Sequence, residues 1–396
     1  MKIVHISNYF NDYIGYHENI LPKYHKLLGH DVCLITSDRN YLQPVGDAKQ
    51  RDYKNKEGIL VKRIKTTYEL KHRFVIFKNL YKSIEEEKPD YIFHHGITQP
   101  SLFTVIRYKK DHPSVFVAAD NHADLNISAR NIIWKILYYK NVLRINLKKI
   151  INDIDVVFGV TPARCFFAFL ELGVPKSKIR FLPQGCDINE AEKYKKLDEN
   201  KKDHDYLNII TGGKYVKDDK GLVDLINGLR NLPVKLRIFG TIKNDYLSNL
   251  IKKEKNVTFI GWLDREGIFK NYLNSDLAIW PKLHTTLIED AMAVGLPVIL
   301  RYYGSTCHLI RGNGFYLFSD EGREINCIFR LLLENKELIE YFKKCAEKMR
   351  SIFSYYEIAK ESIDYYYDSS PKMLHNIFMN DPLCKFENRN WYKLIN

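Results

Sequence analysis

Two lysines flank a loop that follows a predicted strand in the second half of the chain. The strand is Leu207–Thr211, and Lys214 and Lys220 lie in the glycine-bounded loop Gly212–Gly221. Two cations in such a loop can neutralise the charge that develops on a diphosphate leaving group. A solvated surface loop would show the same pattern, so the two lysines alone leave both interpretations open.

A second polar loop follows the strand predicted at Leu277–Trp280 and leads into a helix. It carries His284, Thr285 and Thr286, and the first helical turn carries Glu289 and Asp290. A threonine hydroxyl can cap the helix, and a carboxylate is stabilised near its N-terminus by the helix dipole. Loops at the carboxyl ends of parallel strands are where doubly wound sheets bind ligands. An ordinary β-α-β unit with a capping carboxylate is the alternative.

The first half of the chain places a histidine in a comparable position. His122 follows the strand predicted at Val115–Ala119, within D-N-H-A-D. Gly15 precedes a helix predicted from Tyr16 to Leu28, and no G-x-G-x-x-G pattern surrounds it, so a dinucleotide is not indicated. Taken alone, His122 is also typical of a loop residue with a satisfied hydrogen bond, and Gly15 of a turn.

Strands alternate with helices along the chain, which predicts an α/β fold with parallel sheets. A length of 396 residues exceeds one ordinary core and favours two domains. We place the first domain at residues 1–190, the second at 191–353, and a returning helix with a tail at 354–396. The charged run Glu190–Asp205 is interpreted as the linker between the domains.

The charge of the chain indicates anionic partners. The formal net charge is +13, which suits a nucleotide, a lipid diphosphate, an anionic membrane or nucleic acid. The seven cysteines show no paired spacing, so they indicate no zinc site. The N-terminus is predicted to be a strand rather than a signal peptide, and no apolar run approaches the ~20 residues that span a bilayer. We expect a cytoplasmic protein.

One long helical stretch, Asn126–Asn152, contains six bases and no acid. At helical spacing one apolar stripe is predicted to face the core: Ile132, Ile136, Leu143, Leu147 and Ile150. A second stripe lies opposite: Trp134, Tyr138, Val142 and Ile145. A basic and aromatic second face is typical of a helix that lies on a membrane surface. Cover by neighbouring helices would produce the same pattern.

The run E-D-A-M-A-V-G-L-P-V-I, Glu289–Ile299, resembles the E-A-M-A-x-G-x-P-V-I signature of glycosyltransferase family 4, the retaining enzymes of GT-B fold. Lys178–Asp187 and Gly29–Val32 also resemble motifs of that family. The resemblance implies two Rossmann-like domains facing a central cleft. It implies metal-independent transfer of a hexosyl or N-acetylhexosaminyl group from a nucleotide-sugar, expected to be a UDP-sugar, to a lipid-linked or surface glycan.

The resemblance also assigns roles to the residues above. His122 and Lys220 would be catalytic; Lys214, Lys220 and Gly15 would bind the donor diphosphate; His284, Thr285 and Thr286 would lie at the sugar and ribose, with Asp290 or Glu289 on the ribose. We find no D-x-D pair in a convincing loop, so no metal is expected, and no cofactor beyond the donor as co-substrate. An anionic membrane surface at the inner face of the cell membrane is the further expected partner, and nucleic acid is not expected.

The chain departs from the family at one position. Family members carry a second carboxylate in the loop before the helix, and Lys282–Thr286 contains none. Two other functions therefore stay open. The first is a nucleotide-sugar epimerase of the same fold, which would release free sugar. The second is a non-catalytic basic adaptor for membrane or nucleic acid.

Overall fold

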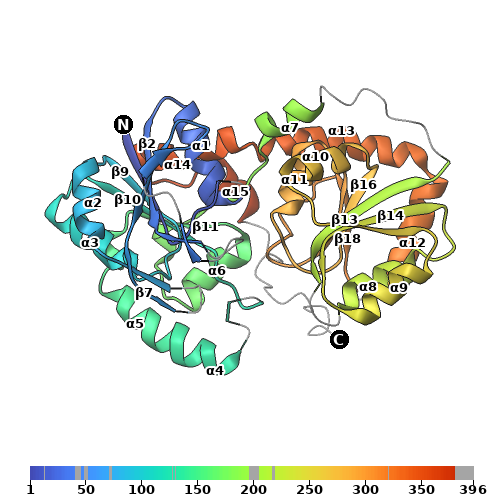
Figure 1. Cartoon of the computed structure of the whole chain (residues 1–396), viewed down its shortest axis with the longest axis horizontal. Coiled ribbons are helices and arrows are strands. Elements are labelled where there is room, and N and C mark those ends of the chain that lie inside the picture. The colour runs from blue at the N-terminus through green and yellow to red at the C-terminus, as the bar shows by residue number, and fades with distance from the viewer. Residues whose placement is uncertain are drawn as a thin grey trace. The chain divides into compact units, whose positions relative to one another are not determined.

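The computed structural model describes residues 1–12, 14–40, 46–48, 52–70, 74–126, 128–129, 131–195, 205–215, 219–319 and 321–379. It has the predicted α/β fold, with two Rossmann-like units that each contain a parallel sheet (Figure 1). Unit 1 is Met1–Gln184 together with the segment that begins at Tyr355, and unit 2 is Gly185–Ser354. The predicted linker begins instead with a helix, α7 (Ile188–Lys195), and residues 196–204 lie outside the described residues.

The described part of unit 1 contains an eight-stranded sheet in the order β12-β11-β10-β9-β1-β2-β6-β5. Its strands are β1 (Lys2–Ser7), β2 (Asp31–Ser37), β5 (Asp52–Lys54), β6 (Leu60–Ile64), β9 (Tyr91–His94), β10 (Phe116–Asn121), β11 (Val156–Gly159) and β12 (Ile179–Phe181). All neighbours are parallel except β5 and β6. Two small hairpins accompany the sheet: β3 (Arg39–Asn40) with β4 (Gly46–Asp47), and β7 (Thr66–Leu70) with β8 (Phe74–Phe77).

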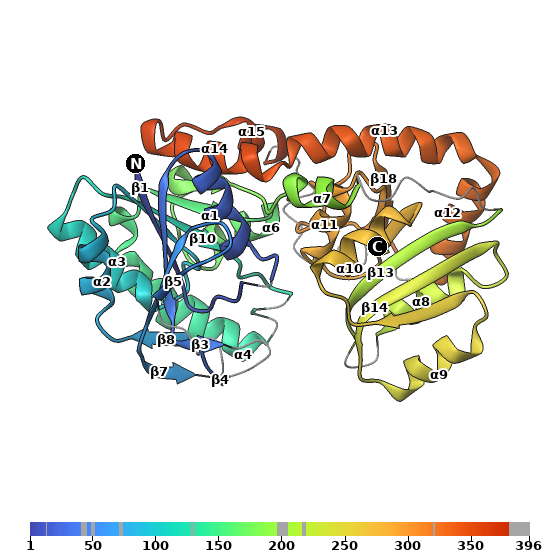
Figure 2. The ribbon, with the colours of Figure 1, turned by 45° about the horizontal axis from the view of Figure 1, so that its top comes forward.

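Helices cover both faces of this sheet (Figures 1 and 2). They are α1 (His17–Leu27), α2 (Leu80–Glu87), α3 (Ser101–Asp111), α6 (Pro162–Leu170), α14 (Tyr355–Tyr367) and α15 (Met373–Phe378). The returning helix α14 packs against α1, and α2 packs against α3. Strand β1 is buried almost throughout, as expected of a parallel strand covered on both faces.

The basic helix of unit 1 differs from its prediction. It runs from α4 (Ile132–Trp134) through a π-helical stretch, Lys135–Leu143, into α5 (Arg144–Lys148), with Asn131 as its cap. In the first predicted stripe Leu143, Leu147 and Ile150 are buried, but Ile132 and Ile136 are exposed. The reason is the π-helical stretch, because i→i+5 hydrogen bonding rotates successive residues away from the faces that a 3.6-residue period predicts. The prediction of a core-facing stripe is therefore wrong for the first half of the helix.

The described part of unit 2 contains a six-stranded parallel sheet in the order β15-β14-β13-β16-β17-β18. Its strands are β13 (Leu207–Tyr215), β14 (Val234–Ile242), β15 (Val257–Gly261), β16 (Leu277–Trp280), β17 (Val298–Arg301) and β18 (Gly314–Leu317). Its further helices are α8 (Lys220–Gly228), α9 (Asp245–Lys253), α10 (Arg265–Leu273), α11 (Leu287–Ala293), α12 (Gly322–Glu334) and α13 (Lys336–Ile352). Helices α8, α9 and α12 form one layer, and α7, α10 and α11 lie on the other face of the sheet (Figure 2).

Each sheet has one point at which the strand order reverses. In unit 2 the chain moves outward from β13 through β14 to β15, and then returns to β16 on the other side of β13. In unit 1 the reversal lies between β1 and β9. Doubly wound sheets bind ligands beyond the carboxyl ends of the strands at such a switch point. The topology therefore selects one region in each unit.

Among the described residues, no helix is both long enough and apolar enough to cross a bilayer.

Candidate functional site

The loops after β13 and β16 lie side by side at the switch point of unit 2. A Cβ atom on Gly221 would lie 3.5 Å from the Cβ of Lys282, and the Lys282 ammonium is 3.1 Å from a carboxylate oxygen of Asp219. The polar residues expected from the sequence after these two strands are thus brought to one edge of the sheet. Lys282 was not selected from the sequence, because a lone lysine in a polar loop is indistinguishable from a solvated one.

The segment around Lys214 is a strand and not the predicted loop. Strand β13 continues to Tyr215 and pairs with β14, with Lys214 opposite Thr241. The glycines before it allow this, because a Cβ on Gly212 would lie 2.2 Å from the ring of Phe239. The Lys214 side chain is exposed at the end of the strand. The rigid sheet therefore fixes the backbone position of this cation.

Lys220 is the first residue of α8 and is also exposed. Asp219 caps the helix by accepting from the N–H of Leu222 at 3.3 Å. Residues 216–218, between the two predicted diphosphate lysines, lie outside the described residues. Three cations thus lie at the switch point: Lys214 near the end of β13, Lys220 at the start of α8, and Lys282 in the loop after β16.

The carboxylate of Glu289 pairs with His284 in the interior of the loop after β16. Oε1 of Glu289 is 2.6 Å from Nε2 of His284, and both side chains are buried. The loop is held further by Tyr303, whose hydroxyl accepts from the N–H of His284 at 2.7 Å. The second oxygen of Glu289, Oε2, is buried without a hydrogen-bond partner in the described part of the chain. This carboxylate therefore keeps an acceptor for a further donor.

The carboxylate of Asp290 forms an ion pair with Arg265, a partner that the sequence did not indicate. The Nη2 and Nη1 atoms of Arg265 lie 3.1 and 3.3 Å from its two oxygens. Burial raises the pKa of Asp290 to about 6, although the nearby guanidinium opposes this shift. Asp187 also lies 3.6 Å from Arg265. The arrangement is that of a buried ion-pair cluster with both oxygens of Asp290 in use.

The two threonines differ from the predicted caps. Thr286 stands at the N-cap of α11 with helical backbone angles, and its side chain makes no capping hydrogen bond. The hydroxyl of Thr285 lies 3.5 Å from the N–H of Leu287, at the outer limit of a hydrogen bond. Both side chains are half-buried. A capping role is thus wrong for Thr286 and weak for Thr285, and their hydroxyls keep other hydrogen-bonding capacity.

His122 lies at the carboxyl edge of the unit 1 sheet, as predicted. Its Nε2–H donates to Oδ2 of Asp120 at 3.1 Å, and its side chain is 37% exposed. In the neutral ring Nδ1 is then an acceptor. Burial alone would raise the pKa of Asp120, but the charges and hydrogen bonds of His122 and His95 hold it well below its usual range. The ionised Asp120 therefore orients the His122 ring.

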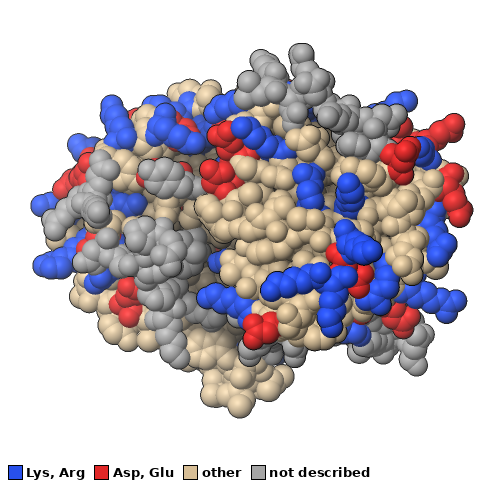
Figure 3. All heavy atoms as spheres, turned by 45° about the vertical axis from the view of Figure 1, so that its right-hand side comes forward, with Lys and Arg blue, Asp and Glu red and all other residues tan. Residues whose placement is uncertain are grey.

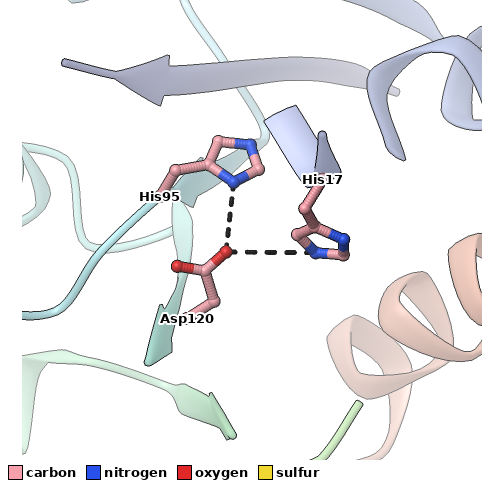
Figure 4. Close-up of side chains that lie close together, drawn as sticks. All are labelled: His17, His95 and Asp120. Carbon is pink, nitrogen blue, oxygen red and sulfur yellow. Dashed lines mark hydrogen bonds and ion pairs between the residues drawn. The ribbon is translucent and has the colours of Figure 1, made fainter. Parts of the chain in front are cut away.

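Asp120 also faces two histidines that sequence reasoning missed. His95 follows β9 and His17 opens α1, and both rings point at the Asp120 carboxylate (Figure 4). Nδ1 of His95 is 3.1 Å from Oδ2 of Asp120, and Nε2 of His17 is 3.9 Å from the same atom. The position of His95 directly after a parallel strand was an available signal, whereas His17 lies at the start of a helix well after β1. Gly15 is half-buried in the segment before α1 and precedes His17 by two residues.

A separate pocket of about 390 Å³ lies at the opposite, amino-terminal edge of the unit 2 sheet. It is lined by residues that precede β16 and β17, Ser275 and Pro297, and by Lys195 and Lys343. The volume of this pocket does not make it the functional site, because the candidate residues at the switch point lie at the other edge of the sheet.

On the face of the molecule in Figure 3, basic side chains are spread among acidic ones.

Comparisons with known proteins place the second half of the chain beside a known family. Residues 191–349 match the family model of glycosyl transferases group 1. The matched residues include every candidate residue of unit 2: Lys214, Lys220, Lys282, His284, Thr285, Thr286, Glu289 and Asp290. No curated protein sequence matches the chain.

Solved structures resemble the chain over nearly its whole length. A glycosyltransferase from Rickettsia africae is 17% identical, with a TM-score of 0.67, covering 93% of this chain and 98% of that one. Anabaena HepE in complex with UDP is also 17% identical, with a TM-score of 0.67 and coverage of 92% and 99%. A UDP-GlcNAc 2-epimerase from Neisseria meningitidis is 13% identical, with a TM-score of 0.57 and coverage of 92% and 99%. At these identities the likeness shows the GT-B fold alone.

Proposed function

We propose that the protein is a retaining glycosyltransferase that uses a nucleotide-sugar donor, expected to be a UDP-sugar carrying a hexose or N-acetylhexosamine. The observation that carries the proposal is the switch point of the group 1 domain, where Lys214, Lys220 and Lys282 accompany a carboxylate with an unused acceptor. Lysine ammonium groups stabilise a departing diphosphate, and a carboxylate oxygen accepts from ribose hydroxyls. Both features suit a nucleoside diphosphate.

In the proposed reaction the bond between the sugar C1 and the diphosphate oxygen breaks, and a bond forms from C1 to the acceptor oxygen on the same face. The acceptor hydroxyl gives its proton to the departing phosphate oxygen. Lys214 and Lys220 would neutralise the charge on that phosphate, in place of a divalent cation on the diphosphate. His122 would orient the transferred sugar, since its ring is fixed by ionised Asp120 and its Nδ1 is an acceptor.

For the ribose contact we favour Glu289 over Asp290. Glu289 keeps the unpartnered oxygen Oε2, whereas Arg265 engages both oxygens of Asp290. The family signature aligns Asp290 with the ribose contact. We propose that the adjacent residue, Glu289, makes this contact instead. Asp290 would then hold the local structure through Arg265.

The acceptor is proposed to be a lipid-linked or growing surface glycan, such as a capsule or O-antigen precursor. The basic helix supports this, because it exposes the large apolar side chains of Ile132, Ile133, Ile136, Leu137, Val142 and Ile145. Lys148 and Lys149 are exposed at its end, whereas Lys135 and Lys140 pair with Glu171. Exposed apolar area beside bases is typical of a helix that lies in a membrane interface.

The proposal is tested by incubating the protein with a panel of nucleotide-sugars, with and without a membrane extract that contains lipid-linked acceptors. We expect release of the nucleoside diphosphate together with incorporation of the sugar into lipid-extractable glycan. Release of free sugar, or of an epimer, in the absence of any glycosylated product would instead support the epimerase function. Neither turnover nor binding of any nucleotide-sugar would support the non-catalytic adaptor.

A further inference from the structure

The histidine cluster of unit 1 has the composition of a metal site. The nitrogen Nε2 of His17, the nitrogen Nδ1 of His95 and Oδ2 of Asp120 lie within 4.8 Å of one another, and all three residues are buried. Figure 4 shows the two rings turned toward the one carboxylate. We propose that these three side chains bind a divalent transition-metal ion of the zinc class. The inference does not rest on the glycosyltransferase function.

His17 supplies the first independent observation. Its Nε2 is buried and has no hydrogen-bond partner in the described part of the chain. The distance of 3.9 Å to Asp120 Oδ2 is too long for a hydrogen bond. The ring is fixed from its other side, where Nδ1 lies 3.2 Å from the hydroxyl of Tyr355. A buried and unpaired nitrogen pointing at a carboxylate is costly unless a further group lies between them.

His95 supplies the second observation, because it begins a buried chain of hydrogen bonds. Its Nε2 is 3.0 Å from Nδ1 of His5, whose Nε2 is 2.9 Å from Nδ1 of His25. Nε2 of His25 is 2.8 Å from the hydroxyl of Ser362, and that hydroxyl is 2.7 Å from the carbonyl oxygen of Ala359. All the side chains of this chain are buried.

The direction of these hydrogen bonds depends on what occupies Nδ1 of His95. If Nδ1–H donates to Asp120, each ring of the neutral chain must accept on Nε2, and Ser362 must donate to His25. Ser362 then has no hydrogen for the carbonyl of Ala359. If Nδ1 binds a metal, every N–H points away from Asp120, and Ser362 is free to donate to Ala359. Metal-bound histidines characteristically donate their second N–H in this way.

Two of the three ligand-atom distances suit a tetrahedral ion. Bonds of ~2.0–2.1 Å to imidazole and carboxylate place ligand atoms roughly 3.3 Å apart, between the observed 3.1 and 3.9 Å from Asp120 Oδ2 to the two nitrogens. The two nitrogens lie within 4.8 Å of each other. Oδ1 of Asp120 accepts from the N–H of Gly96 at 2.6 Å, which fixes the carboxylate. Two imidazoles and one carboxylate favour zinc, cobalt, nickel or ferrous iron over magnesium or calcium. The fourth position is open to water, and His122 keeps its hydrogen bond to Oδ2.

The test uses full-length protein without a histidine tag, stripped with chelator and titrated separately with Zn²⁺ and Co²⁺. We expect one equivalent of metal per chain by elemental analysis, visible absorption from bound Co²⁺, and a zinc-dependent rise in Tm. His17→Gln should abolish all three. His94→Gln is the matched control, because His94 is buried nearby but bonds to Ser101 at 2.8 Å.

Several results would overturn the proposal. One is a wild-type protein that binds no equivalent of either ion, since a proton on His95 would then account for the hydrogen-bond chain. Another is stoichiometric binding that survives in His17→Gln. If His17→Gln does not fold, the Co²⁺ spectrum of the wild-type protein decides instead: nitrogen ligation supports the site, and the spectrum of the hydrated ion contradicts it.

Discussion

Oε1 of Glu289 lies 2.6 Å from Nε2 of His284, so the loop after β16 and the helix that follows it are joined through one buried pair. Among the described residues, Oε2 of Glu289 has no hydrogen-bond partner. Glu289 lies next to Asp290, the residue that the family signature aligns with the ribose contact, and we propose Glu289 for that contact instead. Substitution of Glu289 should therefore weaken nucleotide binding, whereas substitution of Asp290 should lower stability.

Glu289→Gln is expected to weaken binding of UDP by about 10- to 100-fold, since a hydrogen bond to a charged acceptor contributes ~1.5–3 kcal/mol. Its stability should change little, because the amide oxygen still accepts from His284. Isothermal titration calorimetry and thermal unfolding measure the two quantities. Unchanged affinity would remove Glu289 from the nucleotide site.

Asp290→Ala should act on stability instead. It leaves the guanidinium of Arg265 without its bidentate partner, and breaking a buried ion pair in this way costs about 3 kcal/mol or more. Urea denaturation of the variant should show the loss. Arg265→Met with Asp290→Ala is the control, and it should recover part of the stability because the buried guanidinium is removed together with its main partner.

Lys220→Ala should lower turnover by roughly 10²–10³-fold, as is typical when one contact to transition-state charge is lost. Lys252→Ala is the matched control, since Lys252 is an exposed lysine on another helix of the same unit. Both variants should unfold at the wild-type temperature. Near-wild-type turnover in Lys220→Ala would rule out its assignment to the diphosphate.

His122→Ala should fold normally, bind UDP as the wild type does, and lose about 10²-fold or more in transfer, the scale associated with misplacement of a reacting group. Kinetics and calorimetry on the same preparation separate these effects. A parallel loss of UDP binding would mean that His122 supports the nucleotide site and does not act on the sugar.

Glu361 predicts a pH dependence of stability. Burial raises its pKa from 4.5 to about 7, so the folded protein favours the neutral carboxyl group. Its contribution to stability is therefore greatest below pH 4.5 and is lost as the pH rises toward about 7. Glu361→Gln should raise Tm at pH 8 and make little difference at pH 4. Glu357→Gln, an exposed acid on the same helix, should raise Tm at neither pH.

The exposed helix predicts salt-sensitive binding to anionic vesicles. Ile133 and Leu137 are 63% and 59% exposed, so Ile133→Ser with Leu137→Ser should weaken vesicle binding without unfolding the protein. Trp134 and Tyr138 of the predicted second stripe are less suitable, because Tyr138 stacks on Trp134 and packs against Phe74. Tyr246→Ser with Trp262→Ser removes comparable exposed apolar surface from unit 2 and should leave binding intact. Equal losses in both double variants would argue against a membrane face.

The sequence predicted the α/β fold because buried parallel strands are continuous apolar runs bounded by turn residues, as at Leu277–Trp280. It also predicted that His122 and Lys220 lie at the carboxyl edges of their two parallel sheets. It could not predict that β13 continues through Lys214, because strand extension depends on pairing with β14. Arg265, His17 and His95 were missed because they and their partners come from segments far apart in the chain. The apolar stripe of the basic helix was predicted with a 3.6-residue period, which does not hold in the π-helical stretch.

Calorimetric titration of UDP into the wild-type protein and into Lys214→Ala with Lys220→Ala tests whether this switch point binds the donor. We predict one UDP bound per wild-type chain, and an affinity at least 10-fold lower in the double variant, since each lost charge-assisted contact contributes about 1.5 kcal/mol or more. Binding of uridine alone should differ little between the two proteins. Equal UDP affinity in both proteins, or no UDP binding by the wild type, would contradict the assignment of this switch point to a UDP-sugar donor.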